Sequence, residues 1–517
     1  MRKYQIVLLF MLLNSIGAWS QTYSITDFGA VPDGKTLNTS AIQKAINVCT
    51  EKGGTVYVPA GVFVTGTIEL KSNVNLYLET GAVIKGSPNL ADYRPYQSPV
   101  YDSPAQYGIV YAHKAHNVSI TGQGAIDGNE EAYFIWDKAK KIDWGGTKYT
   151  RQKENFRKVL SGIDDGPVEP KERPRQMVIF SECTNVSLKD IQLLKSPFWT
   201  LHFADCDGVI AQGLKIRGSL AVPNNDGMDI TSCNNVLVSN CDIRTGDDAI
   251  VVTGYAHHFE LPGYENLIHE SANINITNCN LQSRSSGIRI GFLDQNTVRN
   301  INICNVNITN SNRGIGIFVR DSGSIENVTI SQVNIETRLH TGDWWGNGEP
   351  IHISAVRGTE KGRLGQVRNV IFRDITCRSE NGILLYGSAE SQLEGIQFEN
   401  VRLTIIPGKL NEIAGGNIDL RGAYGDKQLF ESDLPAILAI HSKNLTIKDL
   451  TVNWENVKDD FFKNAIQVQN FSGFRMDDIK ITSVLDNPKL KRIVIENGSG
   501  LSTNLSESEY ELKNVKK

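Results

Sequence analysis

Asn327-Val328-Thr329-Ile330-Ser331-Gln332-Val333-Asn334-Ile335 is the stretch of sequence that decides the fold. Apolar residues stand at offsets +1 and +3 from Asn327, and after a shift by one residue they stand at +6 and +8. This alternation predicts two short strands joined by a corner, each with one face turned inward. A helix would need a 3.6-residue period, which this stretch lacks.

The same pattern recurs along most of the chain. Its segments begin at Asn185, Gly208, Asn235, Asn273, Asn300, Asn327, Asn369, Gly395, Asn444 and Gly473. Successive starts lie 23 to 49 residues apart, which is too irregular for propeller blades but suits a solenoid whose coils carry loop insertions. We therefore predict an all-β fold, a single-stranded right-handed parallel β-helix with an N-terminal capping helix. Ladders of asparagine amides at the corners would satisfy backbone groups at each bend. A β-sandwich with Asn-rich turns is the alternative.

A third strand follows in most coils, and its start can be aligned between coils. Its first residues are Asp226, Asp248, Ser286, Arg313, Glu349 and Asn381. Because coils stack about 4.8 Å apart, these residues should form a column along one outer face. Asp226 and Asp248 then become neighbours on adjacent coils.

Length and composition favour one elongated domain. A solenoid grows by adding coils, so 517 residues do not require several domains. With 53 Lys and Arg against 57 Asp and Glu, there is no basic excess for binding nucleic acid, and we expect no nucleic-acid partner.

The N-terminus is typical of a secretory signal. Arg2 and Lys3 precede an apolar run from Ile6 to Leu13, and Ala18-Trp19-Ser20 ends the segment. Residues 1–20 are therefore predicted to be cleaved on export to the periplasm or the extracellular space. No later stretch approaches the roughly 20 apolar residues that cross a bilayer, so we expect no membrane span.

The remaining chain divides into three predicted parts. Residues 21–90 form the N-terminal cap and first coils, with a helix from Thr39 to Cys49 covering the open end of the solenoid. Residues 91–497 form the β-helix domain, interrupted by insertions at 130–175 and at about 407–435. Residues 498–517 are predicted to be a poorly ordered tail. We expect a monomer.

Eight cysteines in an exported chain raise the question of disulfides. Cys241, Cys279 and Cys377 fall on inward strand positions and are predicted to be small core residues. Cys183, Cys206 and Cys233 each lie two residues before a segment start, where stacking brings them close, and a bridge there stays open. No Cys or His spacing indicates zinc, and we expect no metal and no cofactor.

Two short acidic motifs are the candidate catalytic centre. They are Asn224-Asn225-Asp226-Gly227 and Gly246-Asp247-Asp248-Ala249. Stacking brings Asp226, Asp247 and Asp248 into one pocket, where mutual repulsion makes one of them keep a proton near neutral pH and act as an acid. A calcium site or a solvated loop end is the alternative interpretation.

With these motifs, the chain resembles the family 28 glycoside hydrolases, the polygalacturonase group of pectin-degrading enzymes, over about residues 24–405. Further matching stretches are Ile25-Thr26-Asp27-Phe28-Gly29-Ala30, Thr65-Gly66-Thr67-Ile68, Gly122-Gln123-Gly124-Ala125-Ile126-Asp127-Gly128 and Ser196-Pro197-Phe198-Trp199-Thr200-Leu201-His202-Phe203. The resemblance implies that Asp247 is the general acid and that Asp226 and Asp248 hold and deprotonate the attacking water. It also implies inversion at the anomeric carbon, with carboxyl groups about 6.5 to 9.5 Å apart.

Two motifs of the family are absent. Its Gly-His-Gly segment falls at Ser285-Ser286-Gly287, and its Arg-Ile-Lys segment falls at Gly316-Ile317-Phe318. The second change removes the cations that hold a uronate carboxylate in the family. Arg289, Arg313 and Arg320 are candidate replacements because a guanidinium binds a carboxylate with two hydrogen bonds. The full set predicted to bind substrate is Asn224, Ser286, Arg289, Arg313, Trp345, Glu349 and His352.

The leading hypothesis is an exported glycosidase that hydrolyses a pectic or related plant polysaccharide or oligosaccharide by single displacement. Long loops at 130–175 and 338–349 would close one end of the groove and favour exo action. A polysaccharide lyase, with Ca²⁺ on Asp226 and Asp248 and an arginine base, is the first rival. A non-catalytic carbohydrate-binding β-helix is the second, since the fold alone implies no chemistry.

Overall fold

The computed structural model describes residues 21–97, 105–141, 145–158, 166–255, 269–425, 428–485 and 487–516. The expected signal segment, residues 1–20, lies outside these ranges, so export stays a prediction. Among the helices described, none combines the length and the apolar content that a membrane crossing requires.

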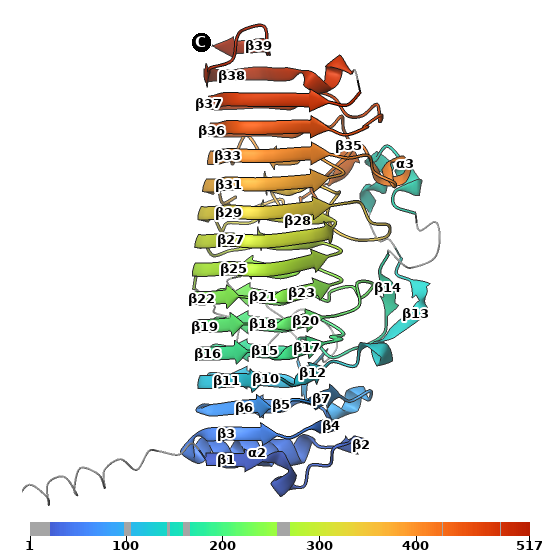
Figure 1. Cartoon of the computed structure of the whole chain (residues 1–517), viewed down its shortest axis with the longest axis vertical. Coiled ribbons are helices and arrows are strands. Elements are labelled where there is room, and N and C mark those ends of the chain that lie inside the picture. Colours follow the sequence, from blue (N-terminus) through green and yellow to red (C-terminus); the bar gives the residue numbers. More distant parts are fainter. Residues whose placement is uncertain are drawn as a thin grey trace, which may run out of the picture.

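The chain folds into a right-handed parallel β-helix, a rod of stacked coils (Figure 1). The first stack is β1 (Gln21–Ser24), β3 (Gly54–Val58), β6 (Val74–Leu78), β11 (His116–Gly122), β16 (Thr184–Lys189), β19 (Asp207–Gln212) and β22 (Asn234–Ser239). The second is β2 (Asp33–Leu37), β4 (Gly61–Thr65), β7 (Ala82–Gly86), β12 (Ala125–Asp127), β17 (Gln192–Leu194), β20 (Lys215–Arg217) and β23 (Asp242–Thr245).

From the next coil onward, the strands of these two stacks merge into one long strand per coil. The long strands are β25 (Ser271–Ser283), β27 (Val298–Ser311), β29 (Ile325–Thr337), β31 (Val367–Ser379), β33 (Leu393–Ile405), β36 (Ile437–Trp454), β37 (Ile466–Ser483) and β38 (Ile493–Thr503). The third stack carries the site described below. It is β5 (Ile68–Leu70), β10 (Val110–His113), β15 (Val178–Ser181), β18 (Leu201–Ala204), β21 (Met228–Thr231), β24 (Ile250–Thr253), β26 (Ser286–Phe292), β28 (Arg313–Val319), β30 (Ile351–Ala355) and β32 (Ile383–Tyr386).

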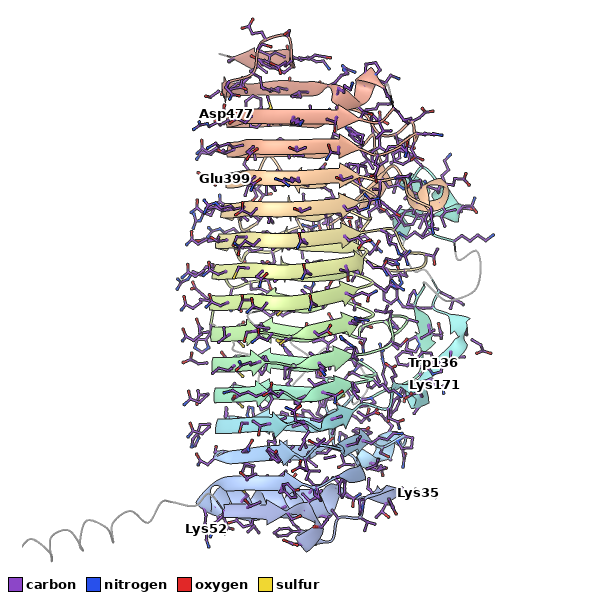
Figure 2. All side chains as sticks on the ribbon, in the orientation of Figure 1. Lys35, Lys52, Trp136, Lys171, Glu399 and Asp477 are labelled. Carbon is purple, nitrogen blue, oxygen red and sulfur yellow. The ribbon has the colours of Figure 1, made fainter. Side chains whose placement is uncertain are left out.

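The predicted register is confirmed. The residues at offset +1 of successive segments are backbone partners, as in Val186 with Val209, Val209 with Val236 and Ile301 with Val328. All of these side chains are buried in the continuous core of the rod. In Figure 2, Glu399 of β33 lies at the outer face of the strand stack, as the alternation of inward and outward side chains requires.

The corner residues explain why asparagine and glycine begin the segments. Asn185, Asn235 and Asn300 have φ between 54° and 57°, and Gly208 has φ 71°. This left-handed conformation is strained for most residues but accessible to Gly and Asn. The asparagines also form the predicted ladder, since Asn300 Nδ2 donates to Asn273 Oδ1 at 3.2 Å and Asn327 Nδ2 donates to Asn300 Oδ1 at 3.3 Å.

An amphipathic helix covers the N-terminal end of the rod, as expected. Helix α2 (Thr39–Lys52) buries Ile42, Ala45, Ile46 and Cys49 against the first coils. Cys49 accepts a hydrogen bond at its carbonyl from Gly53, where the helix ends. The helix thereby keeps the end of the core away from water.

Insertions leave the rod on one side, where Figure 1 shows β13 (Phe134–Ala139), β14 (Val168–Pro170), β35 (Leu429–Glu431) and α3 (Asn411–Ala414). The remaining short elements are β8 (Pro95–Tyr96), β9 (Ala105–Gln106), β34 (Asn417–Asp419) and the 3₁₀ turns η1 (Ile25–Phe28), η2 (Leu90–Asp92), η3 (Glu130–Tyr133), η4 (Gly145–Tyr149), η5 (Lys153–Asn155) and η6 (Pro488–Lys491). Figure 2 marks the β13–β14 arm by Trp136 and Lys171. Residues 145–158 contact the α3 region, because Arg157 N donates to Ile413 O at 2.7 Å.

The prediction of a poorly ordered tail after residue 497 was wrong. Strand β38 continues to Thr503, and β39 (Glu511–Lys516) pairs with it in parallel. The reason is that backbone pairing on the exposed last coil satisfies hydrogen bonds even where few apolar side chains are buried.

The cysteines form no disulfide. All eight are free thiols, including Cys183, Cys206 and Cys233, whose bridge the sequence left open. These three stack on successive coils, and Cys233 Sγ accepts a hydrogen bond from Cys206 N at 3.3 Å. Cys241, Cys279 and Cys377 are buried, as predicted for core residues.

Candidate active site

The predicted column of outward residues exists on the third stack. Gly227 N donates to Asp248 O at 2.9 Å and Ala249 N donates to Ser286 O at 2.9 Å, so Asp226, Asp248 and Ser286 occupy successive coils. Ser286 is in turn the backbone partner of Arg313. A parallel outward column runs through Asp229, Val251, Arg289, Gly316 and His352.

The three candidate catalytic carboxylates meet. One oxygen each of Asp226, Asp247 and Asp248 lies within 4.8 Å of the others. Asp226 belongs to one coil and both Asp247 and Asp248 belong to the next, so the coil spacing of about 4.8 Å brings the three together. Two oxygens at this separation bind one water between them, since each hydrogen bond is about 2.7 Å long. The carboxyl-group separation expected for inversion stays a prediction.

Backbone donors hold Asp247 in position. Its Oδ2 accepts from Asn224 N at 3.2 Å and its Oδ1 accepts from Asp248 N at 3.0 Å. Its carbonyl accepts from Thr245 Oγ1 at 2.9 Å and from Ser283 Oγ at 2.7 Å. These four bonds fix the turn that presents the carboxylate to the pocket.

Asp248 and Asp226 differ in how many of their oxygens are occupied. Ser286 N donates to Asp248 Oδ1 at 2.8 Å, and Arg289 Nε donates to Asp248 Oδ2. Asp226 Oδ1, by contrast, is buried and accepts no hydrogen bond from any part of the chain that the structure describes. Asp226 Oδ1 is therefore wholly available to a water molecule or a substrate hydroxyl, whereas each oxygen of Asp248 already accepts one hydrogen bond and can accept one more.

Burial and mutual repulsion raise the pKa of two of these acids. Burial and the charge of Asp248 raise the pKa of Asp247 to about 6. Burial and the charge of Asp247 raise the pKa of Asp226 well above its ordinary value. The cluster thus keeps at least one proton near neutral pH, as the sequence predicted.

A fourth carboxyl, that of Asp229, was missed by the sequence analysis. It is buried, neither of its oxygens has a partner among the described residues, and burial raises its pKa well above the ordinary value. The alignment of the third strands could have revealed it, because Asp229 stands at a position whose side chain points outward and is the backbone partner of Val251 on the next coil. Burial thus favours the protonated form of this carboxyl.

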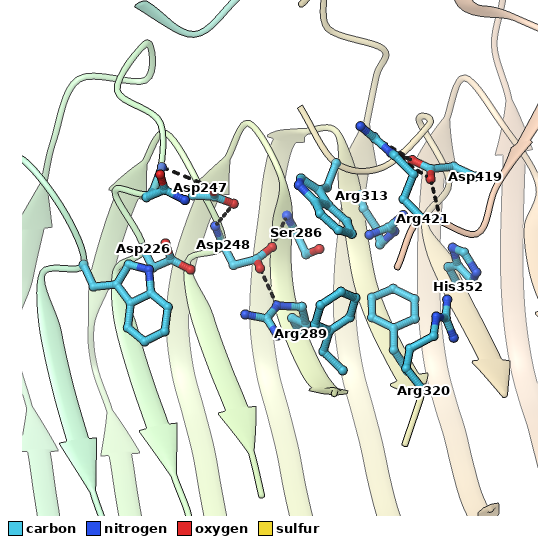
Figure 3. Close-up of a pocket in the computed structure, with 15 residues that line it drawn as sticks. Asp226, Asp247, Asp248, Ser286, Arg289, Arg313, Arg320, His352, Asp419 and Arg421 are labelled. Carbon is cyan, nitrogen blue, oxygen red and sulfur yellow. Dashed lines mark hydrogen bonds and ion pairs between the residues drawn. The ribbon is translucent and has the colours of Figure 1, made fainter. Parts of the chain in front are cut away.

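The acids open into a pocket of about 120 Å³ (Figure 3). Figure 3 shows the carboxylates at one end of the pocket, with Arg320, His352 and Arg421 at the other. Its lining is Trp199, Asn224, Asp226, Asp247, Asp248, Ser286, Arg289, Phe292, Arg313, Phe318, Arg320, Trp345, His352, Asp419 and Arg421. Aromatic rings of this kind stack on sugar faces.

Six of the seven residues predicted to bind substrate line this pocket: Asn224, Ser286, Arg289, Arg313, Trp345 and His352. Glu349 does not. It is buried behind the pocket wall, where its Oε1 accepts from Arg313 Nε at 2.9 Å and contacts His352 Nδ1 at 3.0 Å. It therefore positions two pocket residues instead of facing the substrate.

Asp419 and Arg421 also line the pocket, and the sequence analysis missed both. They come from the polar insertion after residue 407, where no repeat marks a position. Arg421 Nη2 donates to Asp419 Oδ2 at 2.7 Å, and the guanidinium lies 5.2 Å from the Trp345 ring. Two further supports that sequence reasoning missed are Arg173, whose Nη2 donates to Asn224 Oδ1 at 3.0 Å, and Arg157.

Three insertions are joined at the far end of the pocket by Arg157. This buried residue donates from Nη1 to Trp344 O and from Nη2 to Gly346 O, and its amide bonds Ile413 O. Arg421 Nη2 also donates to Trp344 O. The segments around 157, 344 and 421 therefore form one connected wall.

The acidic cluster also has a spacing that would suit a cation. A divalent cation would need oxygens of Asp226 and Asp248. The Arg289 guanidinium already occupies Asp248 Oδ2 and repels a second positive charge there. The ion pair thus disfavours calcium at this position.

Comparisons with known proteins agree with the fold and with the resemblance to family 28. A family model described as Glycosyl hydrolases family 28 matches residues 49–415. A probable polygalacturonase of Vitis vinifera is 27% identical over 256 residues, covering 46% of this chain and 45% of the relative. An exo-poly-alpha-D-galacturonosidase of Dickeya chrysanthemi is 31% identical over 255 residues, covering 44% of this chain and 41% of the relative.

A solved structure gives the same picture at lower identity. The Yersinia enterocolitica family 28 exopolygalacturonase superposes with a TM-score of 0.62 at 19% identity, over 96% of this chain and 78% of that one. This likeness shows the fold. The chain matches less than half the length of the Vitis and Dickeya proteins, 45% and 41% respectively.

Proposed function

Because the chain belongs to glycosyl hydrolases family 28 and is a glycosidase, we propose that it removes sugars from the end of a pectic oligosaccharide or polysaccharide with inversion at the anomeric carbon. The observation that carries this proposal is the convergence of Asp226, Asp247 and Asp248 within 4.8 Å at the mouth of a pocket whose other end is walled by insertions.

In the proposed mechanism, Asp247 is the general acid. Its carboxyl gives its proton to the glycosidic oxygen as the bond to the anomeric carbon breaks, so that the leaving sugar departs as an alcohol. A carboxyl whose pKa is raised to about 6 is suited to this task, because it is still partly protonated at mildly acidic pH and then transfers its proton readily.

Asp226 is proposed as the general base. Its Oδ1 has no protein donor, so a water molecule that approaches the opposite face of the sugar has an acceptor there. As the oxygen of the water bonds to the anomeric carbon, its proton passes to Asp226. Asp248 is held by Ser286 and Arg289 and accepts the second hydrogen of the water, which orients the attack.

The productive state has Asp247 protonated and Asp226 ionised. The pKa values of both acids are raised. The productive state therefore competes with states that carry the same number of protons but hold them on other carboxyls of the cluster. The pH profile of kcat/KM should therefore be bell-shaped, and its two limbs should report the macroscopic pKa values of the coupled pair.

Terminal action is supported by the wall that Arg157 holds together. The segments around Trp344 and Arg421 meet across the far end of the pocket, and Trp345 and Arg421 line it. A polysaccharide that enters such a pocket is stopped by the wall, and only its end reaches the acids.

The decisive experiment is digestion of a size series of pectic oligosaccharides labelled at the reducing end. We expect stepwise loss of one small product and a first product with inverted anomeric configuration by NMR. A retained anomer, or random internal cuts from the first minute, would contradict the proposal. Products that absorb in the ultraviolet, with activity lost to a chelator, would identify a lyase.

Export and oligomeric state are part of the same proposal. The basic start and apolar run of residues 1–20 support export, and we propose that the exported chain is a monomer. Mass spectrometry of the protein recovered outside the cytoplasm should give a mature N-terminus near Gln21, and light scattering should give the mass of one chain. A retained leader or a larger mass would contradict these two points.

A further inference from the structure

The loop between β20 and β21, residues 218–225, is held by the insertion that lies between β12 and β15. Glu130 of that insertion is buried, and both of its carboxylate oxygens lie 3.2 Å from Ser219 N, which donates to them. Farther along the loop, Val168 N donates to Ala221 O at 2.8 Å. The insertion therefore contacts the loop at two points before the first acidic motif begins.

Arg173 of the same insertion makes a third contact, at the start of the acidic motif. Its side chain is buried, and the guanidinium lies 5.1 Å from the Phe198 ring. Nη1 donates to Pro197 O at 2.6 Å and to Pro223 O at 2.8 Å, and Nη2 donates to Asn224 Oδ1 at 3.0 Å. A guanidinium suits this task because its donors point in fixed directions. One side chain thus fixes two adjacent residues of the loop.

The backbone of Asn224 has a conformation that its surroundings must maintain. Its φ of 55° lies in the left-handed region, which residues other than glycine populate sparsely. In this conformation its amide donates to Asp247 Oδ2 at 3.2 Å, and Asp247 N in turn donates to Asn225 O at 3.3 Å. The bond from Arg173 restrains the side chain of the same residue. It thereby keeps the amide of Asn224 directed at the carboxylate.

The bond from the Asn224 amide affects both the orientation and the proton affinity of Asp247. A hydrogen bond to a carboxylate favours the charged form, so this bond lowers the pKa of Asp247, while burial raises it to about 6. The charged groups that face Asp247 are Asp226, Asp248 and Arg289. A general acid must also point at the oxygen that it protonates, and a small misplacement slows the reaction.

We propose that Arg173 is a positioning residue for the acidic cluster, which holds the Asp247 carboxyl in its reactive orientation through Asn224. This inference rests on the proposed function, in which Asp247 is the general acid. Arg173 is not one of the described residues that line the pocket, so it acts through Asn224, which does line it. The insertion thereby has a role in catalysis, because it anchors the loop that orients the acid.

The test measures the apparent pKa of Asp247 without substrate, so that it does not depend on the hydrolysis assignment. Aspartate carboxyl carbons are labelled with ¹³C and titrated by NMR, and the signal of Asp247 is the one absent from Asp247→Asn. We expect Arg173→Met to raise this pKa by about half a pH unit or more, because the bond from Asn224 loosens. The kcat on a pectic oligosaccharide should fall about tenfold.

Two further variants separate positioning from a direct effect of charge. Arg173→Lys keeps the positive charge, but one ammonium group does not reproduce the fork, so most of the pKa shift should remain. Asn224→Gly accommodates the left-handed φ and removes the acceptor of Arg173, and it should also raise the pKa of Asp247. The shift in the double variant Arg173→Met/Asn224→Gly should be smaller than the sum of the single shifts. Full restoration by lysine, or additive shifts, overturns the inference.

The matched control is Lys171→Met, which removes a positive charge from the same insertion. Lys171 is exposed, and its Nζ donates to Ala132 O at 3.3 Å, within the insertion itself. This variant should leave the pKa of Asp247 unchanged. Circular dichroism checks the fold of every variant, and Asn224→Gly leaves the insertion itself unaltered should Arg173→Met detach it.

An unchanged pKa of Asp247 in both Arg173→Met and Asn224→Gly overturns the inference. The expected shifts in a protein whose unmutated form turns over no pectic substrate would uphold the positioning of Asp247 by Arg173 and refute the proposed function alone.

Discussion

Asp248 shows at the scale of single residues how this chain builds its acidic cluster without the histidine of the family pattern. Ser286 at that position contributes its backbone amide, and Arg289, three residues later, contributes its guanidinium to the other oxygen. The sequence indicated Arg289 as a cation for the substrate. The structure places it in the pocket lining and also in an ion pair with Asp248, a candidate catalytic residue, with both side chains largely buried.

Replacing Asp247 by Asn should abolish activity and stabilise the fold at neutral pH. The pKa of Asp247 rises from 3.8 to about 6 on folding, so its contribution to stability is present below about pH 4 and is lost as the pH rises through 6. Asn removes the repulsion that the ionised carboxylate meets above pH 6.

The check is thermal unfolding of both proteins at pH 4 and pH 7.5. The increase in Tm for Asp247→Asn should be larger at pH 7.5, by roughly 1 °C for each kcal/mol of repulsion removed. An equal effect at both pH values would show that the ionised side chain is not destabilising. The loss of kcat should exceed about a hundredfold if Asp247 is the acid.

At the scale of elements, the wall of the pocket depends on one buried arginine that is not part of the repeat. Arg157 carries its charge among the carbonyls of Trp344 and Gly346, and burial lowers its pKa to about 9. The β-helix coils do not need this residue, because it lies in an insertion. The closed shape of the pocket, by contrast, depends on its hydrogen bonds.

Arg157→Met should therefore change the cleavage pattern more than the stability of the rod. Without its hydrogen bonds the segment around residue 344 loses its anchor, and longer substrates should reach the acids from within the chain. Chromatography of early digestion products should then show internal fragments, and limited proteolysis should cut within 339–349. If limited proteolysis shows that the wall has become mobile but the cleavage products are unchanged, the wall is not the cause of exo action.

The corners of the coils allow a second test at this scale. Asn300 has φ 57° and donates to Asn273, while glycine occupies the equivalent corner at Gly208 and Gly395. Asn300→Ala should destabilise the protein by about 1 to 2 kcal/mol, because alanine is strained in the left-handed region. Asn300→Gly is the matched control.

Urea denaturation of the two variants measures the difference. Asn300→Gly keeps the backbone conformation and loses only the amide ladder bond, so it should lower the free energy of unfolding less than Asn300→Ala does. If both variants lower the free energy of unfolding equally, the ladder bond rather than the φ angle dominates the stability of the corner.

At the scale of the whole molecule, the two ends of the rod determine whether the protein stays soluble. The N-terminal end is covered by α2, whose Ile42 and Ile46 are fully buried. The C-terminal end continues through β38 to β39, with pairing that the composition of residues 498–517 did not suggest. A parallel stack with an uncovered end would offer its last strand to another molecule.

Ile46→Asp should uncover the N-terminal end. A carboxylate in the apolar interface of α2 is costly to bury, so the helix should detach and expose the first coil. We expect concentration-dependent aggregation by light scattering, with the pocket still able to bind substrate at low concentration. Thr50→Asp, at a half-buried position of the same helix, is the control and should remain monomeric.

Much of the fold was predictable because its physical causes are local. The alternation of Val328, Ile330, Val333 and Ile335 and the left-handed corners at Asn and Gly specify each coil without reference to distant parts of the chain. The column containing Asp226, Asp248, Ser286 and Arg313 followed from that register. Asp229 was predictable in principle, since it occupies an outward offset in the same alignment.

The stacked coils, their register and the meeting of three carboxylates follow from the sequence alone, because each depends on a short repeating pattern. The completion of the pocket depends on long-range contacts that the folded chain makes. Asp419 and Arg421 reach it from a polar insertion with no periodicity, and Glu349 turns away from it to hold Arg313. Loop conformations depend on contacts between segments far apart in the chain, such as Arg157 with Trp344, and no local pattern encodes such contacts.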